Sequence, residues 1–149
     1  MDIYNYIKKD HRKVEDLMEQ VVNAADGATR LRLFNEIKNE LTLHAKSEEE
    51  TFYKAILDAT RSKTVEHKMD HANEEHDEIE AFLQKVSGLS ADSDQWLLHF
   101  GELKHAVMHH VEEEEGEIFE KAKTYLSADQ ARKLAKEMDA LKKDMMAGA

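Results

Sequence analysis

Two stretches of the chain place a histidine four residues before a glutamate, a spacing that puts both side chains on one face of a helix. One stretch is HAKSEEETFY at 44–53 and the other is HVEEEEGEIF at 110–119, and a shift of 66 residues aligns them. The aligned pairs are His44 with Glu48 and His110 with Glu114. Imidazole and carboxylate groups together are ligands of transition-metal ions, although one isolated pair is more commonly a surface ion pair.

Apolar residues on the same helical faces indicate that both pairs point into a core. Ile37 and Leu41 stand seven and three positions before His44, and Leu103 and Val107 stand at the same distances before His110. An apolar residue also follows each histidine after eight positions. These spacings follow one stripe of an α-helix, so the histidine and the glutamate interrupt a surface that otherwise packs inside the protein.

The glutamate run at 112–115 divides between this stripe and the outer surface. Only Glu114 shares the apolar stripe, whereas Glu113 lies on a wholly polar row with His109 and Glu117. A run of like charges is in most cases a solvated helix face. We therefore expect Glu112, Glu113 and Glu115 to face solvent.

Two further histidines interrupt apolar stripes elsewhere in the chain. His11 follows Tyr4 and Ile7 and precedes Val14 and Met18 at helical spacing. His76 has the same relation to Met69, Ala72, Ile79 and Leu83. The remaining histidines lie off these stripes or too far along them, and we interpret them as structural or surface groups: His67, His71, His99, His105 and His109. Of these, His71, His105 and His109 could assist a site.

The elements that must position these residues are helices. The chain has no proline and only five glycines, and its commonest residues favour helix. Turn and capping signals divide it into five expected helices, at roughly 2–24, 28–58, 62–87, 92–124 and 128–146. Short connections between long helices predict an all-α, up-down-up-down four-helix bundle with a C-terminal fifth helix. We expect one domain over 1–149, with the bundle at about 2–124 and the extra helix at about 128–146.

The four inward histidines and two inward glutamates should meet near the middle of this bundle. Their distances from the shared loops agree to about one helical turn, at about 1.5 Å of rise per residue. Burying two carboxylates and four imidazoles without partners is costly, and no basic residue shares their stripes. A cation satisfies all six groups, and two carboxylates from opposite helices can bridge two metal ions. Mixed imidazole and carboxylate ligands suit iron, manganese or zinc. The predicted metal ligands are His11, His44, Glu48, His76, His110 and Glu114.

Composition argues against several other classes of function. Acidic residues outnumber basic ones by 32 to 21, which gives a net charge of −11 and argues against nucleic-acid or anionic-membrane partners. The absence of cysteine excludes disulfides and thiolate metal sites. No segment is long and apolar enough for a signal peptide or a membrane span, so we expect a cytoplasmic protein.

Four stretches resemble the hemerythrin-like HHE cation-binding domain family. They are DHRKVEDL at 10–17, ELTLHAKSEEETFY at 40–53, EHDEIEAFL at 75–83 and HHVEEEEGEIF at 109–119. The resemblance covers essentially the whole chain and implies a four-helix bundle around two non-haem iron ions with an oxo or hydroxo bridge. Matched by position, it implies the same six ligands as the residue spacing.

The chain also departs from that family at two kinds of position. Lys54 and Glu120 stand where proline is common, so we expect straighter helices there. Ala72 stands four residues before His76, where oxygen-carrying members have a fifth histidine. One iron should then keep an extra position for water or an exogenous ligand, which argues against simple reversible oxygen carriage.

Three functions are compatible with these residues. The first is a diiron protein that binds or reacts with dioxygen, peroxide or nitric oxide; no general acid or base is identifiable, although Tyr4, Tyr6 and Tyr53 could lie near the site. The second is an iron or oxygen sensor without turnover, and the third is metal storage or scavenging.

The fifth helix has one narrow apolar stripe and no histidine. Leu134, Met138, Leu141 and Met145 recur at spacings of four, three and four. We expect it to pack on its own bundle away from the metals rather than on another chain, which predicts a monomer or a weak homodimer.

Overall fold

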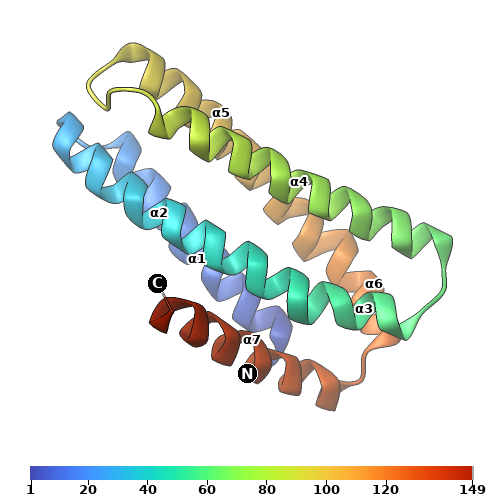
Figure 1. Ribbon diagram of the computed structural model, residues 1–149. Coiled ribbons are helices and arrows are strands. Elements are labelled where there is room, and N and C mark those ends of the chain that lie inside the picture. Colours follow the sequence, from blue (N-terminus) through green and yellow to red (C-terminus); the bar gives the residue numbers. More distant parts are fainter. Residues whose placement is uncertain (149) are drawn as a thin grey trace.

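The computed structural model describes residues 1–148, in which the regular secondary structure is helical and no strand occurs (Figure 1). Within residues 1–148, nine segments form five rods, because α2, η1 and α3 run on without a break, as do α5, η2 and α6. Their bounds are α1 Ile3–Val22, α2 Gly27–Glu48, η1 Glu49–Tyr53, α3 Lys54–Ala59, α4 Lys63–Ser87, α5 Asp94–Glu113, η2 Glu114–Ile118, α6 Phe119–Tyr125 and α7 Ala128–Ala147. The predicted all-α fold with five helices is confirmed, with boundaries that differ by a few residues.

Side-chain caps fix where the rods begin. Asp2, Asp26, Ser62 and Ser93 each accept a hydrogen bond from a backbone N–H in the first turn of the helix that follows. Ser127 forms a complete capping box with Gln130 at the start of α7, as the sequence predicts. The loops that separate the rods are therefore short and defined by residues next to them.

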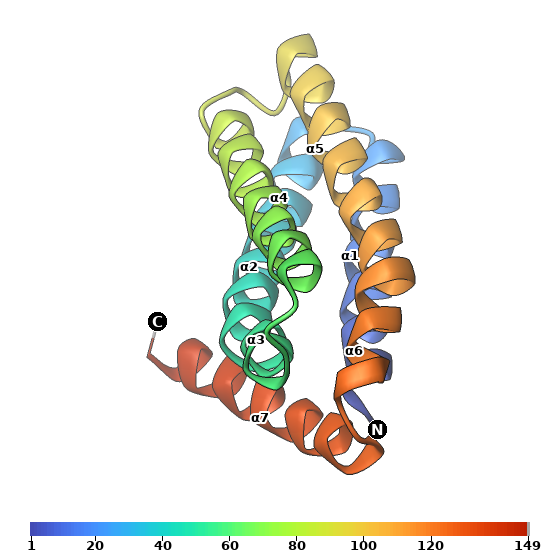
Figure 2. The ribbon, with the colours of Figure 1, turned by 90° about the vertical axis from the view of Figure 1, so that its right-hand side faces the viewer.

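The four long rods lie side by side, and α7 crosses one end of the bundle (Figures 1 and 2). The α7 helix packs on α1, α2 and η1 through Leu134 and Met138, which join a core cluster with Ile3, Ile7 and Phe52. A second core cluster fills the far end of the bundle and includes Trp96, the largest fully buried side chain. The six residues singled out in the sequence belong to neither apolar cluster and fall between the two along the chain, for example His11 between Ile7 and Val14.

Two π-helical segments interrupt the rods directly at the inward glutamates. The segment η1 begins one residue after Glu48, and η2 begins at Glu114. In η1 the hydroxyl of Thr51 donates to the carbonyl of Ser47 at 2.6 Å, which gives that carbonyl a partner where the regular ladder is broken. Each π-helical segment accommodates an extra residue just before Lys54 or Glu120, and the expectation of straighter helices at these two positions stays a prediction.

None of the helices in residues 1–148 combines the length and the apolar character that a membrane crossing requires.

Candidate metal centre

Six side chains from the four long rods converge in the middle of the bundle, and all of them are buried. They form two overlapping groups whose nitrogen and oxygen atoms lie within 4.8 Å of one another. One group pairs His11 and His44 with both glutamates, and the other pairs His76 and His110 with the same glutamates, Glu48 and Glu114. The structure thus brings together every residue that the sequence predicts for the centre.

Each glutamate directs one oxygen to each pair of histidines. Glu48 places Oε2 3.2 Å from Nε2 of His44 and Oε1 3.1 Å from Nε2 of His76. Glu114 places Oε1 3.0 Å from Nε2 of His11 and Oε2 3.5 Å from Nε2 of His110. Both carboxylates therefore lie between the two pairs of histidines.

Several of these atoms are buried without a hydrogen-bond partner, which tests whether a cation fits. Within the described residues they include Nε2 of His11 and His44, both oxygens of Glu48 and Oε1 of Glu114. Metal–ligand bonds of about 2.0–2.2 Å separate neighbouring ligand atoms by about 3.0–3.5 Å. The separations between imidazole and carboxylate atoms match that range, so the donor set fits metal cations.

A ring of four carboxylates orients the histidines from outside. Each Nδ1 lies at hydrogen-bond distance from a carboxylate on a neighbouring rod, which leaves Nε2 directed inward. The pairs are His44 with Asp10 at 2.8 Å, His76 with Glu49 at 2.6 Å, His110 with Glu75 at 2.8 Å and His11 with Glu115 at 2.7 Å. These contacts form a closed ring around the bundle. The carboxylate of α1 binds the histidine of α2, and that of η1 binds the histidine of α4. The carboxylate of α4 binds the histidine of α5, and that of η2 binds the histidine of α1. Such outer partners fix the tautomer and the ring orientation of metal-binding histidines.

In the metal-free protein, the histidines and the carboxylates beside them strongly shift the pKa values of one another. Burial would lower the pKa of His44 and His110, but the carboxylates beside them raise both to about 10. Burial would raise the pKa of Asp10, but hydrogen bonds from His44 and Lys142 lower it to about 2. Without a cation, protons on the imidazoles therefore balance the buried carboxylates, and cation binding must displace them.

Sequence reasoning missed the four outer carboxylates. It placed Glu115 on a solvated face, whereas Glu115 is only partly exposed and binds His11, so that expectation is wrong. Glu112 is exposed as expected, and Glu113 is intermediate. The signal that could have found the ring is positional: Asp10, Glu49, Glu75 and Glu115 each directly adjoin one of the six residues in the chain.

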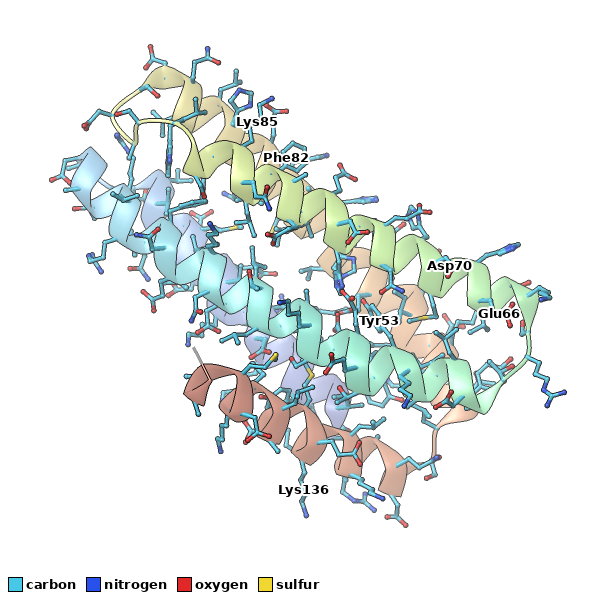
Figure 3. All side chains as sticks on the ribbon, viewed as in Figure 1. Tyr53, Glu66, Asp70, Phe82, Lys85 and Lys136 are labelled. Atoms are coloured by element: carbon cyan, nitrogen blue, oxygen red, sulfur yellow. The ribbon has the colours of Figure 1, made fainter. Side chains whose placement is uncertain are left out.

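Tyr53 is the tyrosine that reaches the centre. Its ring stacks on His76 at 5.4 Å between centroids, and its hydroxyl donates to Oε2 of Glu114. In Figure 3, Tyr53 lies inside the bundle, whereas Lys136 extends outward from α7. Burial and the charge of Glu114 raise the pKa of Tyr53 well above its ordinary value, so it remains a hydrogen-bond donor at neutral pH. Tyr6 instead binds Asp139 on α7, and Tyr4 packs between Phe52 and Phe119.

The other histidines are outside the centre. His67 and His105 are exposed, and Nδ1 of His99 contacts Glu102 at 2.6 Å. His71 and His109 are exposed as well, but both approach Glu75, the carboxylate that holds His110.

A cleft of about 310 Å³ adjoins the centre. The four central histidines line it together with apolar residues such as Leu41, Ile79 and Val107, and the exposed Lys46 and Asp77 line it as well. Because buried histidines and exposed side chains share one cleft, it leads from the surface to the centre and has room for a small molecule.

The family model of the hemerythrin HHE cation binding domain matches residues 2–122. The chain belongs to this family. Its buried histidine and glutamate cluster is thus the part of a hemerythrin-like cation-binding domain that is able to bind metal, and the family implies iron.

Relatives and a solved structure agree with this assignment. A hemerythrin-like protein of Schizosaccharomyces pombe is 26% identical over 95% of the chain and 69% of its own length. A DNA nickase of Nostoc sp. is 29% identical over 95% of the chain, which spans only 39% of that protein. The crystal structure of a hemerythrin HHE cation binding domain-containing protein from Mycobacterium kansasii has a TM-score of 0.86 and 19% identity, over 99% of this chain and 89% of the other. That likeness supports the fold.

Proposed function

We propose that this hemerythrin-like chain holds two iron ions and binds or reacts with dioxygen, peroxide or nitric oxide. The ligands are His11, His44, Glu48, His76, His110 and Glu114. The observation that carries the proposal is that each buried glutamate presents one oxygen to each histidine pair. Two such carboxylates are suited to two cations, and mixed nitrogen and oxygen donors suit iron.

Bound iron would supply one-electron redox chemistry and an open position for a small ligand. The chain's own residues keep the donors ready for that role. Nε2 of each histidine points inward, and Nδ1 is held by a carboxylate of a neighbouring rod. The negative charge of Asp10, Glu49, Glu75 and Glu115 makes the imidazoles better electron donors, which favours oxidised over reduced iron.

The surroundings select the kind of ligand. Apolar residues line much of the cleft, so a small neutral molecule enters it at less cost than a charged metabolite. Tyr53 holds Glu114 through its hydroxyl and closes the centre on the side of η1. Dioxygen, peroxide and nitric oxide all fit a site of this size and polarity.

A sensor or metal-handling protein without turnover is the second candidate. One contact favours it: Lys142 on α7 lies 2.6 Å from Asp10, and Asp10 holds His44. Metal occupancy at His44 is thereby connected to the position of the fifth helix, which could report it to a partner.

DNA cleavage is not part of the proposal. The nickase of Nostoc sp. is more than twice as long as the matched region, and the net charge of −11 disfavours contact with DNA. We therefore predict that the chain does not bind DNA. Its cytoplasmic location also stays a prediction.

Anaerobic loading followed by rapid mixing tests the proposal. The protein is filled with ferrous iron and mixed in a stopped-flow instrument with dioxygen, peroxide and nitric oxide in separate experiments. We expect fast spectral changes with at least one of the three, and a Glu114→Ala variant should show none. If fully loaded protein stays spectrally unchanged with all three ligands, the sensor or metal-handling role replaces the reactive one.

A further inference from the structure

A second pair of histidine–glutamate motifs occupies the outer face of α4 and α5. His71 and Glu75 are four residues apart on α4, and His109 and Glu113 are four residues apart on α5. The two pairs face each other, because both histidines approach both glutamates. This cluster is distinct from the buried centre, and none of its members is one of the six central residues.

The distances within the outer cluster differ from those of ordinary hydrogen bonds. Nε2 of His71 lies 3.5 Å from a carboxylate oxygen of Glu75 and 3.5 Å from one of Glu113. Nε2 of His109 lies 3.6 Å and 3.7 Å from oxygens of the same two residues. Hydrogen bonds between nitrogen and oxygen are about 2.7–3.2 Å long. A tetrahedral site with metal–ligand bonds of about 2.0–2.2 Å has edges of about 3.3–3.6 Å. The two separations from His71 fall in that range, whereas His109 approaches the other oxygen of Glu113.

Charge and burial also favour a cation. Glu75 is 8% exposed, and its carboxylate lies beside that of Glu113 and beside the imidazoles of His71 and His109. Its Oε1 accepts from His110, so Oε2 remains directed to the outer cluster. Ligand atoms from His71, Glu75 and Glu113 lie within 4.8 Å of one another, and His109 is beside both carboxylates.

We propose that His71, Glu75, His109 and Glu113 form a second site, on the surface of α4 and α5, for a divalent transition-metal ion such as zinc. Two imidazoles and two carboxylates are the donor set that zinc accepts in proteins. The site shares Glu75 with the buried centre, so an ion bound outside withdraws charge from the carboxylate that holds His110. This effect of an outer ion on the buried centre rests on the proposed diiron function, whereas the outer site itself does not.

Zinc binding to the chain with its buried centre loaded with iron tests the site. Equilibrium dialysis and elemental analysis count the zinc ions that two double variants retain. One carries His71→Ala and His109→Ala; the matched control carries His67→Ala and His105→Ala, which removes exposed histidines from the same two helices. We expect the control and the unaltered protein to retain one zinc ion more per chain than the first variant.

Cobalt provides a second readout that does not depend on a count. Cobalt(II) bound at the outer cluster should give the intense visible bands of a tetrahedral site, and these should be absent in the His71→Ala, His109→Ala variant. Equal zinc retention in both double variants, or a cobalt spectrum unaffected by removing His71 and His109, would overturn the proposal. If the two double variants differ in zinc retention but the buried centre takes up no iron, the result supports the outer site and contradicts the diiron function.

Discussion

Asp10 on α1 accepts a hydrogen bond from Nδ1 of His44 on α2 at 2.8 Å, although Asp10 is adjacent in the chain to a different central histidine. The orientation of one ligand therefore depends on the neighbouring helix. Lys142 of α7 contacts the same oxygen at 2.6 Å, so a third helix fixes the carboxylate.

Removing this carboxylate should weaken metal binding without removing a ligand. We expect Asp10→Ala to lower the affinity for the metal at His44 by about 10- to 100-fold, as is usual for outer partners of histidine ligands. Asp16→Ala is the control, because Asp16 is exposed on the same helix and binds only Gln20 among the described residues. Competition with a chelator measures both affinities, and equal values would show that Asp10 does not support the centre.

Adjacent glutamates should differ sharply in their effect on the buried metals. Glu114 is fully buried in the centre, whereas Glu113 is partly exposed and faces His71 and His109. Glu114→Ala should abolish retention of two irons per chain, and Glu113→Ala should leave it intact. Elemental analysis after anaerobic loading and gel filtration makes the comparison. Iron loss from both variants would place the ligand register of this rod one residue away from our assignment.

The metal-free protein should become less stable as the pH rises. Burial alone would lower the pKa of His44 and His110, but their carboxylate neighbours raise both from 6.5 to about 10. A raised histidine pKa stabilises the fold fully below the unfolded value and loses that effect as pH passes through the folded value. The lowered pKa values of Asp10 and Glu75 act in acid and do not oppose this trend.

Urea unfolding of the chelated protein at intervals from pH 6.5 to about 10 measures the trend. The iron-loaded protein should be more stable at every pH and should lose less stability over that window, because metal has replaced the protons. A free energy of unfolding that is independent of pH in the chelated protein would mean that the histidines are not paired with the carboxylates.

Removing α7 should separate stability from metal binding. Truncation after Ser127 deletes Leu134 and Met138, which are buried against Ile3 and Phe52, and side chains of this size contribute about 1.5–3 kcal/mol each. We expect a clearly lower Tm but two irons per chain, since the six ligands lie on other elements. If the truncated chain is equally stable and sedimentation shows that a dimer becomes a monomer, α7 is an interface between chains.

The central residues were predictable because helical periodicity determines the direction in which their side chains point. A histidine or glutamate within an apolar stripe must point where Ile37 or Leu103 points, and equal distances from short loops place the four rods in register. The helical fold and the convergence of all six residues follow from this periodicity and these distances.

The outer carboxylates and the π segments could not be derived in the same way. Glu115 lies off the apolar stripe, and its contact with His11 joins η2 to α1, two elements far apart in the chain. The π segment after Glu48 depends on the hydrogen bonds of Ser47 and Thr51, whose residue types are equally compatible with a regular helix. Both features arise from contacts between or within rods that a single stripe does not encode.

The iron content of the unaltered protein tests the central claim most directly. After anaerobic loading with ferrous iron and removal of unbound metal, elemental analysis should give two irons per chain, and Mössbauer spectroscopy after oxidation should show coupled ferric ions with no net spin. A single iron per chain with the signal of an isolated ferric ion would contradict a centre in which Glu48 and Glu114 are shared by two metals.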